Sequence, residues 1–212
     1  MKKRLMPQII FIHPFKTAGG SISKIIKQPD TKPFGWHLTA KYQIKRFNFD
    51  KCFVFATTRN PWDRLVSIWH YGQGNNRNWL GISSGMTFSN WIKIIHHWFR
   101  PKGMGVCLNS TLMCVSVNGQ IKVDYFVNFH TLQEDIKMIN MISGENKTLP
   151  HLNKTLHQEY QYYYNDETRD IVGKLYSDDI KYFGYCFEDK NVSNFERIVN
   201  KRKIKRFLTT FL

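Results

Sequence analysis

The stretch that most constrains the fold is residues 9–22, which read IIFIHPFKTAGGSI. Its first four residues are apolar and predict a short buried strand, and the isoleucines at positions 22, 25 and 26 have the spacing of a helix. The loop between these elements contains a lysine, a threonine and two glycines. In a strand, loop and helix start of this kind, the N–H groups of the loop point to one place, which stabilises an anion such as phosphate.

Two interpretations of this loop stay open on its residues alone. It is either a phosphate cradle or a plain strand–turn–helix whose glycines only form the turn, because short glycine motifs are weak evidence. A Walker A loop has its lysine after the glycines, in the order GxxxxGK[ST], whereas Lys16 precedes Gly19 and Gly20. No part of the chain fits Walker A, so we expect a loop that does not serve ordinary ATP hydrolysis.

Residues 52–57, an apolar run with β-branched and aromatic members, predict a second buried strand, and residues 124–129 predict a third. The second strand is followed by a helix start, because Asn60 is a suitable N-cap and Pro61 suits the first helical position. Asp63 in the first turn complements the helix dipole, and we expect this helix to end near Tyr71, before a loop.

Strands that alternate with helices indicate a parallel sheet covered by helices, so the 212 residues are predicted to form one α/β domain. Its core is expected over about residues 9–188, followed by a basic tail, residues 189–212. The remaining predicted helices cover residues 88–99, 132–142 and 160–176, where apolar residues recur at helical spacing.

The formal net charge of +15, from 31 Lys+Arg against 16 Asp+Glu, indicates an anionic partner. Nucleotides, sulfated or phosphorylated glycans, nucleic acids and membrane surfaces all satisfy this condition. The basic tail has two interpretations: a solvated helix face or frayed end, or a contact with an acidic glycan or membrane surface. Its cations are Lys201, Arg202, Lys203, Lys205 and Arg206.

The four cysteines form no C-x-x-C pair, and no histidine cluster completes a zinc site, so we expect no metal. Reduced thiols are the simpler interpretation for Cys107 and Cys114. The sequence contains no secretory signal with a cleavage site and no apolar stretch long enough to span a bilayer. We therefore expect a soluble protein with a cytoplasmic location.

Several separated stretches resemble one family, the sulfotransferases, in the branch of the heparan sulfate 2-O-sulfotransferase-like enzymes. The loop at residues 13–22 resembles the family's phosphosulfate-binding loop. RNPWDRLVS at residues 59–67 looks like its second motif, whose arginine and serine hold a 3′-phosphate. LPHLNKT at residues 149–155 and DIKYFGY at residues 179–185 are similar to the C-terminal part of the same group. The resemblance extends over most of the chain.

This resemblance implies a P-loop-NTPase-like domain that uses 3′-phosphoadenosine 5′-phosphosulfate (PAPS) as donor. Arg59 and Ser67 would hold the 3′-phosphate of the donor, and Lys154 and Thr155, in a segment similar to the family's cofactor-closing loop, would reach the nucleotide. The 5′-phosphate would be bound by the first loop, through Lys16, Thr17, Ala18, Gly19, Gly20, Ser21 and Ile22.

The implied reaction is in-line transfer of a sulfuryl group to a hydroxyl of an acceptor, expected to be a carbohydrate. Lys16 would neutralise the charge that builds on the leaving phosphate oxygen. A general base must deprotonate the acceptor, and His37 is our choice, because it lies between the two phosphate motifs and HLTA at residues 37–40 resembles the segment that carries the family's base. His13 is expected to pack or to order the loop, and His151 to shape the nucleotide pocket.

Two other functions stay open at this stage. One is a P-loop-like nucleotide kinase, against which the order of lysine and glycines counts. The other is a non-catalytic nucleic-acid-binding protein that uses the net charge of +15. We expect no nucleic-acid partner.

Overall fold

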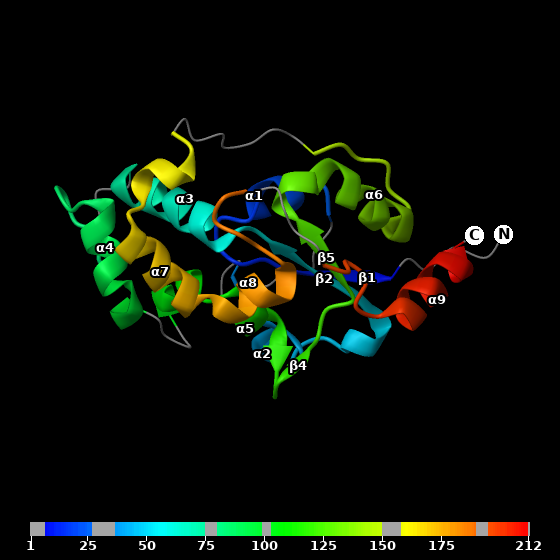
Figure 1. Cartoon of the computed structure of the whole chain (residues 1–212). Helices are drawn as coiled ribbons and strands as arrows, with labels where there is room; N and C mark the ends of the chain where they lie inside the picture. The colour runs from blue at the N-terminus through cyan, green and yellow to red at the C-terminus, as the bar shows by residue number, and fades with distance from the viewer. Residues whose placement is uncertain are drawn as a thin grey trace. The chain divides into compact units, whose positions relative to one another are not determined.

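The computed structural model describes residues 7–26, 37–74, 80–98, 103–149, 158–189 and 195–211 (Figure 1). The chain divides into two compact units. Unit 1 contains Met1–Thr58, Thr111–Leu152 and Glu196–Leu212, and unit 2 contains Arg59–Ser110 and Asn153–Phe195.

Unit 1 is built on a three-stranded parallel sheet in the order β1 (Gln8–Ile12), β2 (Cys52–Thr58) and β5 (Tyr125–Asn128). All three strands lie where the sequence predicted them. Nearly every strand residue is buried, as expected for a parallel sheet covered on both faces. The predicted mixed α/β fold with a parallel sheet and flanking helices is therefore confirmed.

The side chains on one face of this sheet form the main hydrophobic core of unit 1. Phe11 and Phe55 are paired across β1 and β2, and their rings stack with centroids 4.7 Å apart. Helices α1 (Gly19–Ile22), α6 (Leu132–Ser143) and α9 (Lys201–Phe211) contribute to the same core. Members from these helices include Ile22, Ile136, Ile139, Ile142, Ile204 and Phe207.

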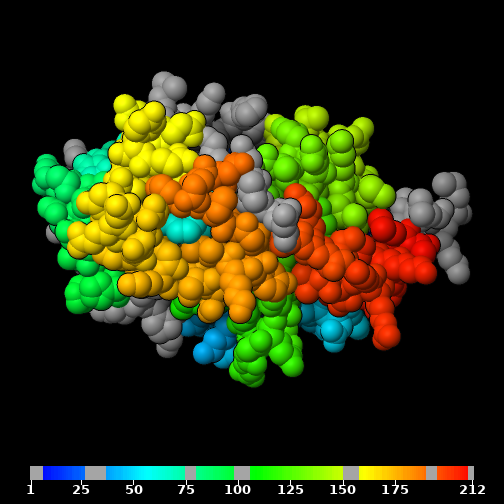
Figure 2. All heavy atoms as spheres, in the orientation of Figure 1, coloured from blue at the N-terminus to red at the C-terminus, as the bar shows by residue number. Residues whose placement is uncertain are grey.

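The C-terminal helix α9 packs into this core although its sequence is strongly basic. Ile204 and Phe207, both beyond residue 188, are buried members of the core. Lys203 points inward, where its Nζ lies 2.8 Å from a carboxylate oxygen of buried Asp124. Figure 2 shows α9, in red, on the surface of the molecule. The helix is thus anchored by its apolar face and one ion pair.

Smaller elements complete unit 1. The hairpin of β3 (Ser116–Val117) and β4 (Gln120–Ile121) turns at Asn118 and Gly119, which both have positive φ, 52° and 74°. Such a pair suits a two-residue hairpin turn. The other elements are α2 (Ala40–Gln43), η1 (Phe49–Lys51), α5 (Thr111–Val115) and η4 (Phe129–Thr131).

Unit 2 is helical in its described residues. Its central helix, α3 (Pro61–Gly74), begins at Pro61 as predicted, and Asn60 Oδ1 accepts a hydrogen bond from the N–H of Trp62. The helix continues past Tyr71, where the sequence placed its end. The remaining elements are α4 (Phe88–Ile94), η2 (Ile95–Trp98), η3 (Gly103–Leu108), η5 (Tyr160–Tyr163), α7 (Asp166–Leu175) and α8 (Ser177–Phe183).

The helix predicted over residues 160–176 is two helices instead of one. The short η5 ends at Tyr163, and α7 begins after Asn165. Asn165 and Thr168 form a capping box, in which each side chain bonds the backbone of the other residue. Because the side chain of Asn165 accepts from the N–H of Thr168 in the new first turn, the chain restarts as a helix there.

Arg64 stabilises unit 2 from its interior. The side chain is almost fully buried, and its Nη2 donates to the carbonyl oxygens of Leu108 (3.1 Å) and Asn109 (2.8 Å). The hydroxyl of Tyr176 also donates to the Leu108 oxygen, at 2.6 Å. The guanidinium therefore satisfies carbonyl oxygens at the end of η3.

Candidate functional site

The loop after β1 has a strained backbone. Lys16 and Ala18 both adopt left-handed conformations, with φ of 64° and 67°. This region costs a non-glycine residue roughly 1–2 kcal/mol. Strained residues of this kind concentrate at active sites and ligand-binding loops, where the surrounding structure holds them in place. The loop between β1 and α1 is therefore a functional-site candidate in geometry as well as in sequence.

The hydroxyl of Thr17 fixes this loop to the sheet. It donates to the carbonyl oxygen of Pro14 (2.6 Å) and lies 2.5 Å from the hydroxyl of Thr57 in β2. Because a hydroxyl has one proton, Thr57 is the donor to Thr17. Thr17 is completely buried. Its side chain thus holds the loop in shape, and a contact between Thr17 and an anion would use its backbone N–H.

Gly19 is required by the close approach of a histidine ring. A Cβ atom at this position would lie 2.3 Å from Nδ1 of His13 and 2.5 Å from its Cε1. The His13 ring is buried and stacks on Phe11 with centroids 4.9 Å apart. His13 therefore packs and orders the loop, as the sequence predicted. Of the other predicted loop residues, Ser21 and Ile22 are buried and Gly20 is exposed.

We expect Gly19→Ala to destabilise the protein by about 1–3 kcal/mol, because the added methyl group overpacks the loop against His13. Urea unfolding measures this loss. Gly74→Ala is the matched control, since a Cβ at Gly74, the last residue of α3, meets nothing within 4 Å and should be neutral or slightly stabilising. Equal stability of the two variants would show that the His13 ring is not held in place.

His37 lies against this loop. Its ring meets the ring of His13 edge-on, with centroids 4.4 Å apart, and the ring of Phe15 at 5.0 Å. Its Nδ1 is 3.3 Å from the carbonyl oxygen of His13. A carbonyl can only accept, so Nδ1 carries the proton and donates it. In the neutral ring, Nε2 is then the basic nitrogen.

Burial lowers the pKa of His37 below its ordinary value of 6.5, and the hydrogen bond to the His13 carbonyl partly opposes this shift. The ring is therefore neutral at pH 7, the state in which a histidine can accept a proton. The side chain amide of Gln43 donates to the carbonyl oxygens of Leu38 (3.1 Å) and Phe11 (3.5 Å). Gln43 thus fastens the segment that carries His37 to β1, a role that sequence reasoning missed.

In unit 2, Arg59 forms a buried ion pair with Asp63. Its Nε donates to one carboxylate oxygen at 2.7 Å and its Nη2 to the other at 2.9 Å. Both side chains are more than nine-tenths buried. This two-point pair fixes the plane and direction of the guanidinium. Asp63 was expected to complement the helix dipole, and the structure adds its contact with Arg59.

The other predicted residues of the second motif lie on the same helix. Ser67 is buried on α3, two turns beyond the helix start. Asn60 is buried too, and its amide donates to the carbonyl oxygen of Cys186 at 2.9 Å. Lys154 and Thr155, together with His151, lie outside the described residues.

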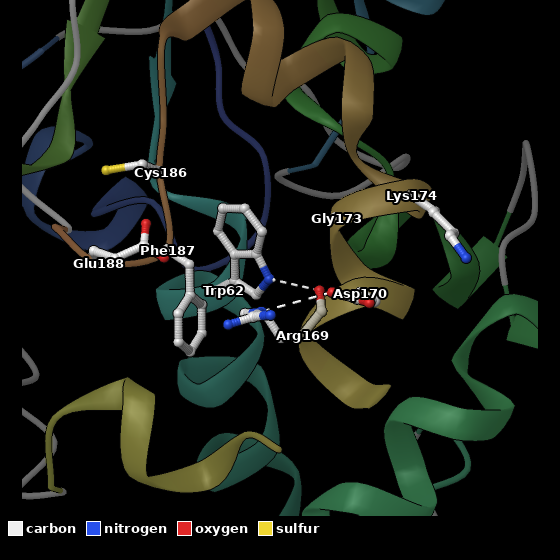
Figure 3. A pocket seen from close by; sticks show the side chains of 8 residues that line it. All are labelled: Trp62, Arg169, Asp170, Gly173, Lys174, Cys186, Phe187 and Glu188. Atoms are coloured by element: carbon white, nitrogen blue, oxygen red, sulfur yellow. Dashed lines mark hydrogen bonds and ion pairs between the residues drawn. The ribbon is translucent and has the colours of Figure 1, made fainter. Parts of the chain in front are cut away.

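Unit 2 also contains an open pocket of about 410 Å³ (Figure 3). The indole N–H of Trp62 donates to the carbonyl oxygen of Arg169, and the Arg169 guanidinium lies 5.7 Å from the centre of the Phe187 ring. Neither Arg59 nor Ser67 lines this pocket, so it is distinct from the predicted donor residues. Its lining is Trp62, Arg169, Asp170, Gly173, Lys174, Cys186, Phe187 and Glu188.

The described residues contain no group of three or more metal-ligating side chains and no helix long and apolar enough to cross a membrane. All four cysteines lie in the described ranges, and none of them forms a disulfide bond.

Comparison with protein families identifies the class of this chain. Residues 21–186 match the model of a sulfotransferase family. Because the match covers well over half of the 212 residues, the chain belongs to the sulfotransferase family, in the branch that its motifs predicted. His37, Arg59 and Ser67 lie inside the matched residues, whereas Lys16 precedes them. Comparisons with curated proteins and with solved structures gave no match.

Proposed function

We propose that this sulfotransferase moves the sulfuryl group of PAPS to a hydroxyl of a carbohydrate acceptor, with His37 as the general base. The geometry around His37 carries the proposal. Its Nδ1 is held by the carbonyl of His13 at 3.3 Å, its Nε2 is the basic nitrogen, and it packs on Phe15, next to Lys16 in the chain. In unit 1, the strained loop thus contributes the cation, Lys16, and the segment that packs against this loop contributes the base, His37.

In the proposed step, the acceptor oxygen attacks the sulfur while its proton passes to Nε2 of His37. The bond between sulfur and the 5′-phosphate oxygen breaks in line with this attack, and that oxygen takes the electron pair. Lys16 neutralises the charge that develops there. Such a transfer needs positioning and charge stabilisation more than covalent chemistry with the protein, by analogy with phosphoryl transfer.

The donor carries phosphate at both its 5′ and 3′ positions, which fits two sets of anion-binding residues. We propose that the strained loop binds the 5′-phosphate through backbone N–H groups of residues 17–20, in the manner of a P-loop. The N–H groups of Ser21 and Ile22 already donate to the carbonyl oxygen of Ala18, both at 3.1 Å. Arg59 and Ser67 are proposed to bind the 3′-phosphate. The Nε and Nη2 edge of Arg59 faces Asp63, so the phosphate would meet the Nη1 and Nη2 edge. Lys154 and Thr155 are also proposed to contact the nucleotide.

A thermal shift tests the donor. We expect 3′-phosphoadenosine 5′-phosphate, without magnesium, to raise the Tm by about 5–10 °C at a hundred times its Kd. This follows from a stabilisation of about 2.7 kcal/mol and roughly 2–4 °C per kcal/mol for a chain of this size. ATP should give a much smaller shift. Equal shifts with the two nucleotides would contradict the proposed donor and favour a kinase-like nucleotide site.

A pair of variants then separates nucleotide binding from folding. Arg59→Ala leaves the carboxylate of Asp63 buried without its partner, which costs about 3–5 kcal/mol. The double variant Arg59→Ala with Asp63→Ala removes both charges and should regain most of that stability. We expect both variants to lose the nucleotide shift. If the double variant still showed the full thermal shift with the nucleotide, Arg59 would not be part of the nucleotide site.

A further inference from the structure

Helix α9 lies at the end of the unit 1 sheet opposite to the strained loop. Its Lys203 Nζ bonds the carboxylate of Asp124, the residue immediately before β5, and the carbonyl of Phe49, just before β2. The strained loop follows the last residue of β1 instead. Because the strands are parallel and β1 has five residues, roughly 17 Å of strand separates the two ends of the sheet.

The exposed face of α9 is cationic. Lys201, Arg202, Lys205 and Arg206 are all exposed and follow one another at i, i+1, i+4 and i+5, so they share one broad side of the helix. Four residues advance a helix by about 6 Å, and α9 is about 16 Å long. The face is therefore a short double row of positive charges.

Few acidic side chains offset this charge. Lys201 pairs with Glu196 at 2.7 Å, and Arg206 donates to the backbone carbonyl of Asp50, whose carboxylate is also exposed. Among the described residues, Arg202 and Lys205 form no side-chain hydrogen bond or ion pair. Lys51 in η1 adds an exposed cation beside the helix.

The packing of α9 restricts the kinds of partner that its exposed face can bind. Among the described side chains, its apolar face is buried in the protein, because Ile204 and Phe207 belong to the core of unit 1. A basic helix binds a bilayer stably when its apolar face enters the lipid, and here that face is occupied. Phe207 and the nearby Phe49 are buried as well, so neither offers the aromatic platform on which single-stranded bases stack.

We propose that the exposed face of α9 binds an acidic polysaccharide at a site separate from the donor loop. A row of flexible cations suits sulfate and carboxylate groups repeated along a single chain, since recognition then depends on charge and spacing. The choice of a polysaccharide over other polyanions rests on the proposed carbohydrate acceptor. In this arrangement, one part of a long acceptor lies on α9 while the protein acts on another part.

Heparin, a polysaccharide with both sulfate and carboxylate groups, is the probe for this surface. We expect Arg202→Gln with Lys205→Gln to weaken heparin binding by roughly 10–30-fold at 0.1 M salt, and to flatten its salt dependence. The control is Lys41→Gln with Lys181→Gln, which removes two equally exposed positive charges elsewhere. This control variant should bind heparin with an affinity within about twofold of that of the unchanged protein.

Three further measurements make the proposal falsifiable. Lys16→Ala and saturating 3′-phosphoadenosine 5′-phosphate should leave heparin binding unchanged; displacement by the nucleotide would overturn the separate site. Equal losses in the two double variants, or none in the α9 variant, would overturn the role of α9. Stronger α9-dependent binding to phosphatidylserine vesicles or duplex DNA than to heparin would overturn the polysaccharide. The heparin assay needs no nucleotide. If the proposed donor is wrong, the thermal-shift test shows it independently of the heparin result.

Discussion

His37→Asn should lower the rate of sulfuryl transfer by about 10²–10⁴-fold, the usual contribution of a general base. Asparagine is chosen because its side-chain amide can replace Nδ1 as the donor to the His13 carbonyl, the hydrogen bond seen at 3.3 Å. The variant therefore retains the local contact and loses the basic Nε2. Nucleotide binding should persist, as measured by the thermal shift with 3′-phosphoadenosine 5′-phosphate.

The rate assay uses labelled PAPS and an acceptor found by screening glycans, lipids and small alcohols. His96→Ala is the control, because His96 is exposed on η2 in unit 2 and has no proposed role. It should retain full activity. A His37→Asn variant as active as His96→Ala would refute the assignment of the base.

The pH dependence provides an independent check of the same residue. Burial lowers the pKa of His37, and the base works only when it is neutral. The acid limb of the rate should therefore be centred below pH 6.5, where the ring becomes protonated and can no longer accept a proton. An acid limb centred above pH 6.5 would point to a base other than His37. The Asn variant should lack this limb.

The sequence predicted the sheet well because buried parallel strands have a distinctive pattern. The segments at residues 9–12, 52–57 and 124–129 are mostly apolar, and the structure places β1, β2 and β5 there. Likewise, Asn60 and Pro61 are local signals that do not depend on distant residues, and α3 begins where they predicted. The family match then supports the class that the motifs indicated.

Other features depend on contacts between distant residues. In the basic C-terminal segment, Ile204 and Phe207 are three positions apart, a spacing that indicates an apolar helix face, but the surrounding charges concealed it. The Asn118–Gly119 turn was missed although this dipeptide favours a hairpin, because the flanking strands have two residues each. In such short strands the alternating pattern is not visible.

At the candidate site, too, local features were predicted from the sequence, whereas contacts between distant residues were not. Sequence reasoning selected His37 by its position between two motifs, but the proton on Nδ1 follows from the His13 carbonyl, a backbone atom 24 residues away. It also grouped Thr17 with residues that contact phosphate, whereas the structure engages the Thr17 hydroxyl with Pro14 and Thr57. Residue type alone does not distinguish a ligand contact from a contact that shapes the loop.

Lys16→Gly should separate the charge of this residue from its backbone strain. Glycine adopts positive φ freely, so the variant should be more stable than the unchanged protein by about 1 kcal/mol, provided that the loop keeps its conformation. Transfer should nevertheless fall by about 10²–10³-fold in kcat, because the cation that stabilises the leaving phosphate oxygen is missing. Affinity for 3′-phosphoadenosine 5′-phosphate should fall much less, by about tenfold or under.

Ala18→Gly is the matched control for this experiment. Ala18 has almost the same φ as Lys16, 67° against 64°, so glycine relieves a similar strain without removing a charge. We expect both variants to gain stability and only Lys16→Gly to lose transfer. If Ala18→Gly lost as much activity, the strained backbone itself would be the catalytic requirement. If neither lost activity, Lys16 would have no part in stabilising the leaving group, and another cation would have to supply that charge.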